Sequence, residues 1–271
     1  MNGSYHGKTL GALSITFNPK YRKAFKPLVE KVSFSPFGNI EKLRETVNDQ
    51  TAFVILEPIQ GESGIHVAPD GFLQDVRKLC DEKGILLIFD EIQAGLGRTG
   101  KMWAHQHWDT VPDILCLAKG IAGGVPMGAT LVKPGILDCI SKGEHSSTFG
   151  GNPLSCAAGT ATMQALTQDK LVENSANMGK IFRQGLDKLK EKHSVIREIR
   201  GKGLMIGIEL KFEVRDILME GIEKGLLLLY SGRNILRLLP PLVITQDDVA
   251  KSLEILDELF TNEEKRKNGQ G

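Results

Sequence analysis

The first half of the chain alternates short apolar runs with an amphipathic stretch. Residues 51–57 (TAFVILE) are apolar and rich in β-branched side chains, which predicts a buried strand that ends at a proline. Residues 72–83 carry apolar side chains at helical spacing and end at a glycine, and residues 85–89 (ILLIF) form a second apolar run. This order predicts a parallel βαβ unit, which residues 114–117 and 128–132 extend as further strands. We therefore expect an open, mostly parallel α/β sheet.

The second half changes to longer helices and shorter strands. An Ala-rich helix is expected over residues 152–166 and a long amphipathic helix over residues 171–192. Short apolar runs and helical stretches then alternate at residues 196–200, 204–210, 216–224, 226–230, 235–238 and 247–259. This order is typical of a smaller α+β domain.

The change in pattern predicts the domain organisation. We expect a large domain over residues 1–165, a connecting long helix over 166–195 and a small C-terminal α+β domain over 196–260. Residues 261–271 (TNEEKRKNGQG) are charged and end in glycine, which favours a solvated, flexible tail.

Composition and charge narrow the class of protein. The 271 residues include 34 Lys and Arg and 33 Asp and Glu, so the positive and negative charges nearly cancel. The net charge therefore gives no indication of binding to nucleic acid or to a membrane surface. No apolar run approaches the roughly 20 residues that cross a bilayer, and the first residues lack a secretory signal pattern. The 4 cysteines show no CxxC spacing, which predicts reduced, buried thiols in a cytoplasmic protein.

Three polar residues directly follow predicted strands: Glu57, Asp90 and Lys119. Open α/β sheets bind ligands at the carboxyl ends of their strands, so these groups are expected at one edge. Ion pairing or helix capping would explain Asp90 or Lys119 alone. Together, and with glycine-rich sequence after the lysine, they fit pyridoxal phosphate, which needs a lysine amine as Schiff base and a carboxylate at its ring nitrogen.

Seven ordered motifs support this interpretation: SYHGKT (4–9), EPIQGESG (57–64), FDEIQAGLGRTG (89–100), LAKGIAGGVPMGA (117–129), GEHSSTFGGNPLSC (143–156), RGKGLMIGIEL (200–210) and LRLLPPLVI (236–244). They resemble the motif set of class III, ornithine-type aminotransferases. Within that class the chain looks most like acetylornithine aminotransferases, in the branch that acts on lysine or ornithine carried with an acetyl or carrier-protein blocking group. The resemblance covers nearly the whole chain up to the tail.

The resemblance implies a fold-type-I enzyme that uses pyridoxal 5′-phosphate. The implied reaction is transamination between the terminal amino group of an N-blocked ornithine or lysine and 2-oxoglutarate, giving the semialdehyde and glutamate. The implied setting is arginine or lysine biosynthesis in the cytoplasm, with a homodimer as the working unit and possible presentation of the substrate on an amino-group carrier protein.

The resemblance also implies roles around the cofactor. Lys119 matches the Schiff-base lysine that moves the proton, and Asp90 matches the partner of the pyridinium nitrogen. Gln93 would bind the ring hydroxyl, and Tyr5 would stack on the ring face. Further cofactor contacts are expected from Glu57, Glu91 and Ile92.

Substrate contacts follow from the same motifs. Thr148, with Ser147 beside it, would reach the phosphate or substrate of the neighbouring subunit. Arg237 matches the arginine that grips the substrate α-carboxylate with its planar fork. Glu62 matches the glutamate that neutralises this arginine, so that one site accepts a cationic amino donor and also glutamate.

Two features depart from the family pattern. Lys8 stands where the family usually has a substrate-binding arginine, which keeps the charge but loses the two-point grip on a carboxylate. Family members also carry a substantial region before the SYHG motif, including the loop that cradles the cofactor phosphate. We therefore expect an N-terminally truncated chain, and an inactive fragment or partner subunit that needs the missing region is the alternative.

Other motifs predict rival functions only weakly. GLGRTG (95–100) matches a dinucleotide fingerprint, but five residues separate it from its strand and no helix opens after it. NGSYHGKT (2–9) nearly matches a P-loop, with LLIFDE as an acidic strand end, but no buried strand precedes it. His105 and His107 are two residues apart and share no helix face, so we expect no metal site.

Overall fold

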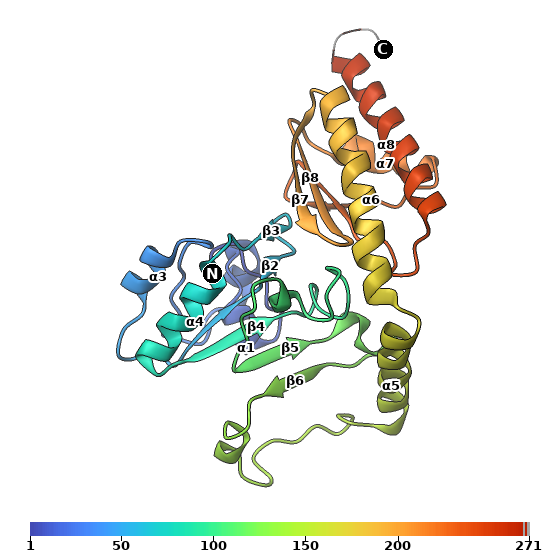
Figure 1. Cartoon of the computed structure of the whole chain (residues 1–271). Helices are drawn as coiled ribbons and strands as arrows, with labels where there is room; N and C mark the ends of the chain where they lie inside the picture. Colours follow the sequence, from blue (N-terminus) through green and yellow to red (C-terminus); the bar gives the residue numbers. More distant parts are fainter. Residues whose placement is uncertain (268, 270–271) are drawn as a thin grey trace. The chain divides into compact units, whose positions relative to one another are not determined.

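The computed structural model describes residues 1–267 and 269. These residues form two compact units, which we describe separately (Figure 1). Unit 1 comprises Met1–Pro58, Ala68–Leu96 and Met102–Lys170. Unit 2 comprises Ile59–Val67, Gly97–Lys101 and the chain from Leu171 onward. The expected division into continuous domains differs from this arrangement, because two short internal segments belong to unit 2.

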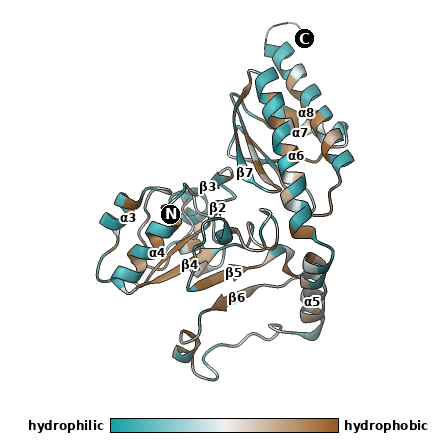
Figure 2. Cartoon of the chain, viewed as in Figure 1, coloured by the Kyte–Doolittle hydropathy of each residue, from teal (hydrophilic) through white to brown (hydrophobic). Residues whose placement is uncertain are grey.

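Unit 1 is built on a four-stranded sheet in the order β1-β4-β5-β6. Its strands are β1 (Phe53–Leu56), β4 (Leu86–Asp90), β5 (Ile114–Leu117) and β6 (Ala129–Val132). The first three run parallel, whereas β6 pairs antiparallel with β5. Figure 2 shows β4 and β5 largely in brown, and the residues of both strands are buried or half-buried.

Short helices and one long helix complete unit 1. Helix α4 (Phe72–Lys83) packs against β4 through a buried face that includes Val76 and Leu79, and it ends at Gly84, whose φ of 64° is the left-handed conformation that glycine adopts readily. The other helices are α1 (Leu10–Ser14), α2 (Pro19–Arg22), η1 (Lys23–Phe25), α3 (Ile40–Thr46), η2 (Ala104–His107), η3 (Lys119–Ala122), η4 (Leu137–Cys139) and α5 (Pro153–Gln168).

Unit 2 has an antiparallel sheet with helices packed on it. The strand order is β7-β8-β10-β9, with β7 (Ile196–Lys202), β8 (Met205–Leu210), β9 (Leu229–Ser231) and β10 (Ile235–Leu238). The helices are α6 (Leu171–Lys192), α7 (Arg215–Glu223) and α8 (Gln246–Lys267). A small hairpin of β2 (Ile59–Gln60) and β3 (His66–Val67) also belongs to this unit.

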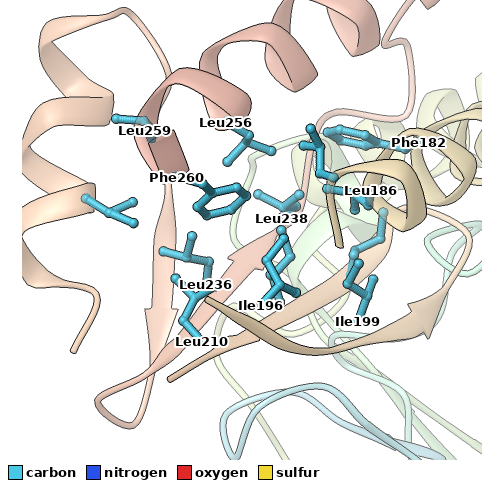
Figure 3. Close-up of a cluster of buried hydrophobic side chains, with 14 of the residues drawn as sticks. Phe182, Leu186, Ile196, Ile199, Leu210, Leu236, Leu238, Leu256, Leu259 and Phe260 are labelled. Atoms are coloured by element: carbon cyan, nitrogen blue, oxygen red, sulfur yellow. The ribbon is translucent and has the colours of Figure 1, made fainter. Parts of the chain in front are cut away.

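The core of unit 2 lies between its sheet and its helices. Figure 3 shows Phe182 and Leu186 of α6 and Phe260 of α8 beside strand residues such as Leu236. All four side chains are at most 2% exposed, so the spacing of apolar residues along both helices is explained by one shared apolar layer.

The flexible tail expected from residue 261 is wrong for its first seven residues. Helix α8 continues to Lys267 because its charged residues have partners within unit 2. Arg266 contacts Glu220 of α7 at 2.5 Å, and the Lys267 ammonium lies 3.5 Å from the centre of the Phe212 ring. Residues 268, 270 and 271 lie outside the described residues.

The expectation of buried thiols holds for only part of the chain. Cys80 is buried and Cys116 is partly buried, whereas Cys139 and Cys156 are exposed. Cys139 lies in η4, none of whose residues is buried, and Cys156 lies on an exposed part of α5, so the apolar residues near them in sequence are a poor guide to burial here. All 4 thiols are unbridged.

A buried histidine joins the C-terminal end of α6 to the second half of α8. His193 is 2% exposed, and its Nδ1 and Nε2 lie 3.0 Å and 2.6 Å from carboxylate oxygens of Glu264 and Asp257. Burial raises the pKa of Asp257, but hydrogen bonds from Lys192 and His193 outweigh it, so the pKa is lowered overall. The same balance of burial against the His193 and Ser194 hydrogen bonds lowers the pKa of Glu264.

This cluster predicts acid-sensitive stability in unit 2. A carboxylate whose pKa is lowered in the folded state contributes stability above its unfolded pKa, and this contribution is lost as the pH falls through the folded value. His193→Gln should lower the free energy of unfolding near neutral pH and flatten its decline in acid. Urea unfolding measured between about pH 7 and about pH 3 tests this.

Arg183→Gln is the matched control for this experiment. Arg183 pairs with Asp187 at 2.9 Å on the exposed face of α6, where ion pairs contribute little. An equal acid dependence in wild type and His193→Gln would contradict the interpretation.

Candidate active site

Three neighbouring strand ends bring the polar residues of unit 1 to one edge of the sheet. Glu57 follows β1, Asp90 ends β4, and Lys119 lies two residues after the end of β5. The register pairs Leu56 with Phe89 and Asp90 with Cys116, so the three strands end at similar levels. The parallel pairing therefore gathers these three residues as the sequence pattern predicts.

Asp90 is a buried carboxylate with fixed donors. It is 6% exposed, its Oδ2 lies 2.8 Å from His6 Nδ1, and its Oδ1 accepts from the backbone N–H of Ile92 at 3.0 Å. His6 is itself held because its backbone N–H donates to Thr16 Oγ1 at 2.9 Å. Each carboxylate oxygen has two lone pairs, so Asp90 can still accept from a ligand donor.

The SYHGKT segment (residues 4–9) also reaches the end of β1. The backbone N–H of Tyr5 donates to Glu57 Oε1 at 3.0 Å, and Glu57 is 6% exposed. The Tyr5 ring packs edge-on against Tyr21, with ring centres 5.6 Å apart. The segment thus supplies an aromatic ring and a histidine next to two strand ends.

Lys119 has an unusual backbone conformation. Its φ is 48°, in the left-handed region that residues other than glycine rarely adopt, and the preceding Ala118 has φ −163° and ψ −141°. Strain of this kind persists where the surrounding structure requires a particular side-chain direction, and it is concentrated at functional sites. The observation supports a functional role for this lysine.

Gln93 offers an acceptor without a donor. Its Oε1 is buried and has no hydrogen-bond partner, which is costly for a polar atom removed from water. It lies three residues after Asp90, in the turn that follows β4. A ligand hydroxyl would satisfy it.

Glu91 is engaged with η2 instead. It is fully buried, and its carboxylate accepts from the backbone N–H groups of Ala104 at 2.5 Å and His105 at 2.8 Å. His105 Nδ1 lies 2.8 Å from the same carboxylate. We therefore assign Glu91 the role of fixing the η2 segment, while its contact with a cofactor stays a prediction.

The remaining candidates of unit 1 are exposed. Ser147 and Thr148 lie on the loop before α5, where Ser147 Oγ accepts from the backbone N–H of Gly150 at 3.0 Å. The Lys8 ammonium lies 5.4 Å from the centre of the Tyr21 ring, a cation–π distance. The geometry of unit 1 by itself does not bring Lys8, Ser147 and Thr148 into one site with Asp90.

The two candidates of unit 2 contact each other. Arg237 Nη1, from β10, donates to Glu62 Oε1 at 2.7 Å, and Glu62 lies in the loop between β2 and β3. Arg237 is 11% exposed, and its Nε is buried without a partner. A carboxylate ligand would satisfy this second donor.

Comparisons with known proteins identify the family. The model of the class-III aminotransferases matches residues 1–260. The acetylornithine aminotransferase of Caldanaerobacter subterraneus is 46% identical over 259 residues, which covers 95% of this chain and 66% of that protein. The chain belongs to the class-III aminotransferases.

Two further relatives agree with this membership. Ornithine aminotransferase 1 of Staphylococcus saprophyticus is 43% identical over 261 residues, covering 96% of this chain and 66% of that protein. The solved ornithine aminotransferase of Toxoplasma gondii, which holds PLP at partial occupancy in its active site, matches with a TM-score of 0.94 at 34% identity, covering 98% of this chain and 64% of its own. The expected fold-type-I architecture is confirmed, and the chain spans just under two thirds of these relatives.

Sequence reasoning missed the direct partner of Asp90. His6 lies in a recognised motif, but only the fold shows that it contacts a residue 84 positions away. Thr16, which holds His6, has no motif signal at all. Within residues 1–267 and 269, no cluster of three or more His, Cys, Asp or Glu side chains is arranged for a metal ion, and no helix is long and apolar enough to span a membrane.

Glu91→Ala should destabilise this class-III chain strongly. It would leave two buried backbone N–H groups without acceptors, at about 1–3 kcal/mol each. The free energy of unfolding from urea titration measures the effect. Glu45→Ala is the control, since Glu45 forms an exposed pair with Lys42 and should change stability by less than about 1 kcal/mol. Similar small effects for both variants would refute the structural role of Glu91.

Proposed function

We propose that this chain carries the catalytic lysine of a pyridoxal-phosphate-dependent aminotransferase. The proposed reaction moves the terminal amino group of an N-blocked ornithine or lysine to 2-oxoglutarate, giving the semialdehyde and glutamate. The family and the names of the acetylornithine and ornithine relatives support this reaction class. The observation that carries the proposal is the gathering of Glu57, Asp90 and the strained Lys119 at adjoining strand ends.

The residues of unit 1 fit the cofactor. Asp90 would accept from the pyridinium nitrogen, with His6 holding its carboxylate in place. The unpartnered Oε1 of Gln93 would accept from the ring hydroxyl, and Tyr5 would lie against the ring face. When bound, pyridoxal phosphate supplies an electron sink for the carbon that loses a proton.

Lys119 would hold the cofactor and move the proton. Its Nζ, once released as a neutral amine, would remove a proton from the substrate carbon that bears the terminal amine. The left-handed φ of Lys119 and the unusual backbone of Ala118 would set the direction in which the Lys119 side chain leaves the backbone. Asp90 would keep a proton on the ring nitrogen, because a nearby carboxylate stabilises the charged form of its partner.

Arg237 and Glu62 would choose between the two substrates. When Glu62 pairs with Arg237, it neutralises the charge of the arginine. This state would suit an amino donor that places no second carboxylate next to Arg237. When glutamate or 2-oxoglutarate binds, its carboxylate would take the place of Glu62. Lys8 would attract a distal carboxylate as a point charge.

The working assembly is proposed to be a cytoplasmic homodimer. Ser147 and Thr148 lie on an exposed loop that also carries Phe149, which is 81% exposed. A second copy of the chain would cover this ring and receive the two hydroxyl groups at its own site. The acceptance of lysine as well as ornithine, and of a carrier-protein blocking group, belongs to the same proposal, as does a place in arginine or lysine biosynthesis.

Lys119→Ala tests the proposed function directly. Loss of the base should lower kcat by at least about 10²–10⁴-fold, and loss of the amine should remove the visible band that borohydride reduces. Half-reaction spectra with glutamate measure both. Lys142→Ala, at an exposed position on the loop before α5, should leave them unchanged. Retained turnover in Lys119→Ala would overturn the assignment.

Arg237→Ala tests the carboxylate site. It should weaken glutamate binding by on the order of 2–5 kcal/mol, with little change in kcat at saturation. The matched control is Arg233→Ala, because Arg233 is 86% exposed and meets Glu213 only at 3.5 Å. An unchanged KM for glutamate in Arg237→Ala would count against its role.

A further inference from the structure

The backbone around Glu62 is anchored on both sides. The Glu62 loop (residues 61–65) connects β2 and β3, whose pairing joins Gln60 to His66. Ser231 Oγ donates to the carbonyl oxygen of Glu62 itself. Two residues later, the carbonyl oxygen of Gly64 accepts from Arg200 Nε at 2.8 Å.

Arg200 is a rigid donor. It is 9% exposed, and its Nη1 lies 2.6 Å from a carboxylate oxygen of Glu198 and 2.8 Å from one of Glu209. The hydrogen bond from Arg200 lowers the pKa of Glu209, so this carboxylate stays ionised near neutral pH. A guanidinium held by two carboxylates keeps its Nε direction fixed.

The Glu62 loop and the strand that follows it are also packed closely against the sheet of unit 2. Gly64 has a φ of +124°, and a Cβ there would lie 2.4 Å from Ile235 Cδ1. A Cβ on Gly207 would lie 3.0 Å from Ile65 Cβ, so the sheet approaches this hairpin at close range. The side chain of Glu62, by contrast, is 36% exposed and can rotate into solvent.

We propose that Ser231 and Arg200 are positioning residues that fix the Glu62 backbone, so that partner exchange at Arg237 is a rotation of one side chain. The proposal rests on the proposed function for the chemical meaning of that exchange. With its backbone fixed, Glu62 returns to Arg237 with little loss of conformational entropy and competes well with a ligand carboxylate. The hydrogen bonds from Ser231 and Arg200 thereby determine how strongly Glu62 competes with a dicarboxylate for Arg237.

Removing one anchor should make Glu62 a weaker competitor. In Ser231→Ala, glutarate, a dicarboxylate that cannot react, should bind about 2–10-fold more tightly, the factor that one ordinary hydrogen bond supplies. Arg200→Lys should shift binding in the same direction, because a lysine ammonium keeps the charge but not the fork that reaches Gly64. Calorimetric titration of the full 271-residue chain measures both.

A double-mutant cycle separates positioning from general packing. In a Glu62→Ala background there is no side chain to position, so Ser231→Ala should cause no further change in glutarate affinity. Ser252→Ala is the matched control, since Ser252 Oγ donates at 2.7 Å to Asp248 within α8. An equal change in both backgrounds overturns the proposal, and so does an absence of glutarate binding to Glu62→Ala, in which Arg237 has lost its competitor.

The cycle distinguishes failure of this proposal from failure of the proposed function. If the chain shows no visible band with pyridoxal phosphate but gives the expected coupling between Ser231 and Glu62 in glutarate binding, the positioning role is supported and the proposed enzymatic function is refuted. If the chain shows the visible band and turnover but no coupling between Ser231 and Glu62, the enzymatic function is supported and the positioning role is refuted. In an active chain, the Ser231→Ala change should also appear in KM for glutamate with kcat unaltered.

Discussion

Parallel pairing of β1, β4 and β5 is the constraint on which the candidate active site depends. Glu57, Asp90 and Lys119 are far apart in sequence, and each lies at or just beyond the end of a strand whose register is set by its neighbour. The segment that carries Tyr5 and His6 then reaches two of these ends through one backbone and one side-chain contact. Strand register therefore determines which side chains can act together.

The end of β4 gives two adjacent carboxylates different surroundings. Asp90 meets His6 and keeps capacity for a ligand, whereas Glu91 meets backbone N–H groups and His105. Consecutive residues leaving a strand point to opposite sides, so one strand end carries both the candidate ligand-binding carboxylate and a supporting one. A substitution of Asp90 is therefore expected to affect ligand binding, and a substitution of Glu91 is expected to affect stability.

Local pattern predicted the strands of the two larger sheets, the main helices and the polar residues at strand ends, because these depend on periodicity and on short motifs, but it did not predict the β2–β3 hairpin. It failed where a tertiary partner decides the outcome. The charges of residues 261–267 suggested a solvated tail, yet Glu220 and Phe212 give them partners. Ser231 contacts a residue 169 positions away, and no spacing rule in the sequence indicates that.

The course of the chain between the two units has a practical consequence. Segments 59–67 and 97–101 of unit 2 follow the ends of β1 and β4, so unit 2 is assembled from three separate stretches. Cleavage after Lys170 would release a C-terminal peptide that retains Ser231 and Arg200 but lacks both carbonyl groups they bind. Expression of that peptide alone would therefore yield an incomplete fold, and crystallographic or NMR work on unit 2 needs either the whole chain or a redesigned fusion that grafts the β2–β3 hairpin.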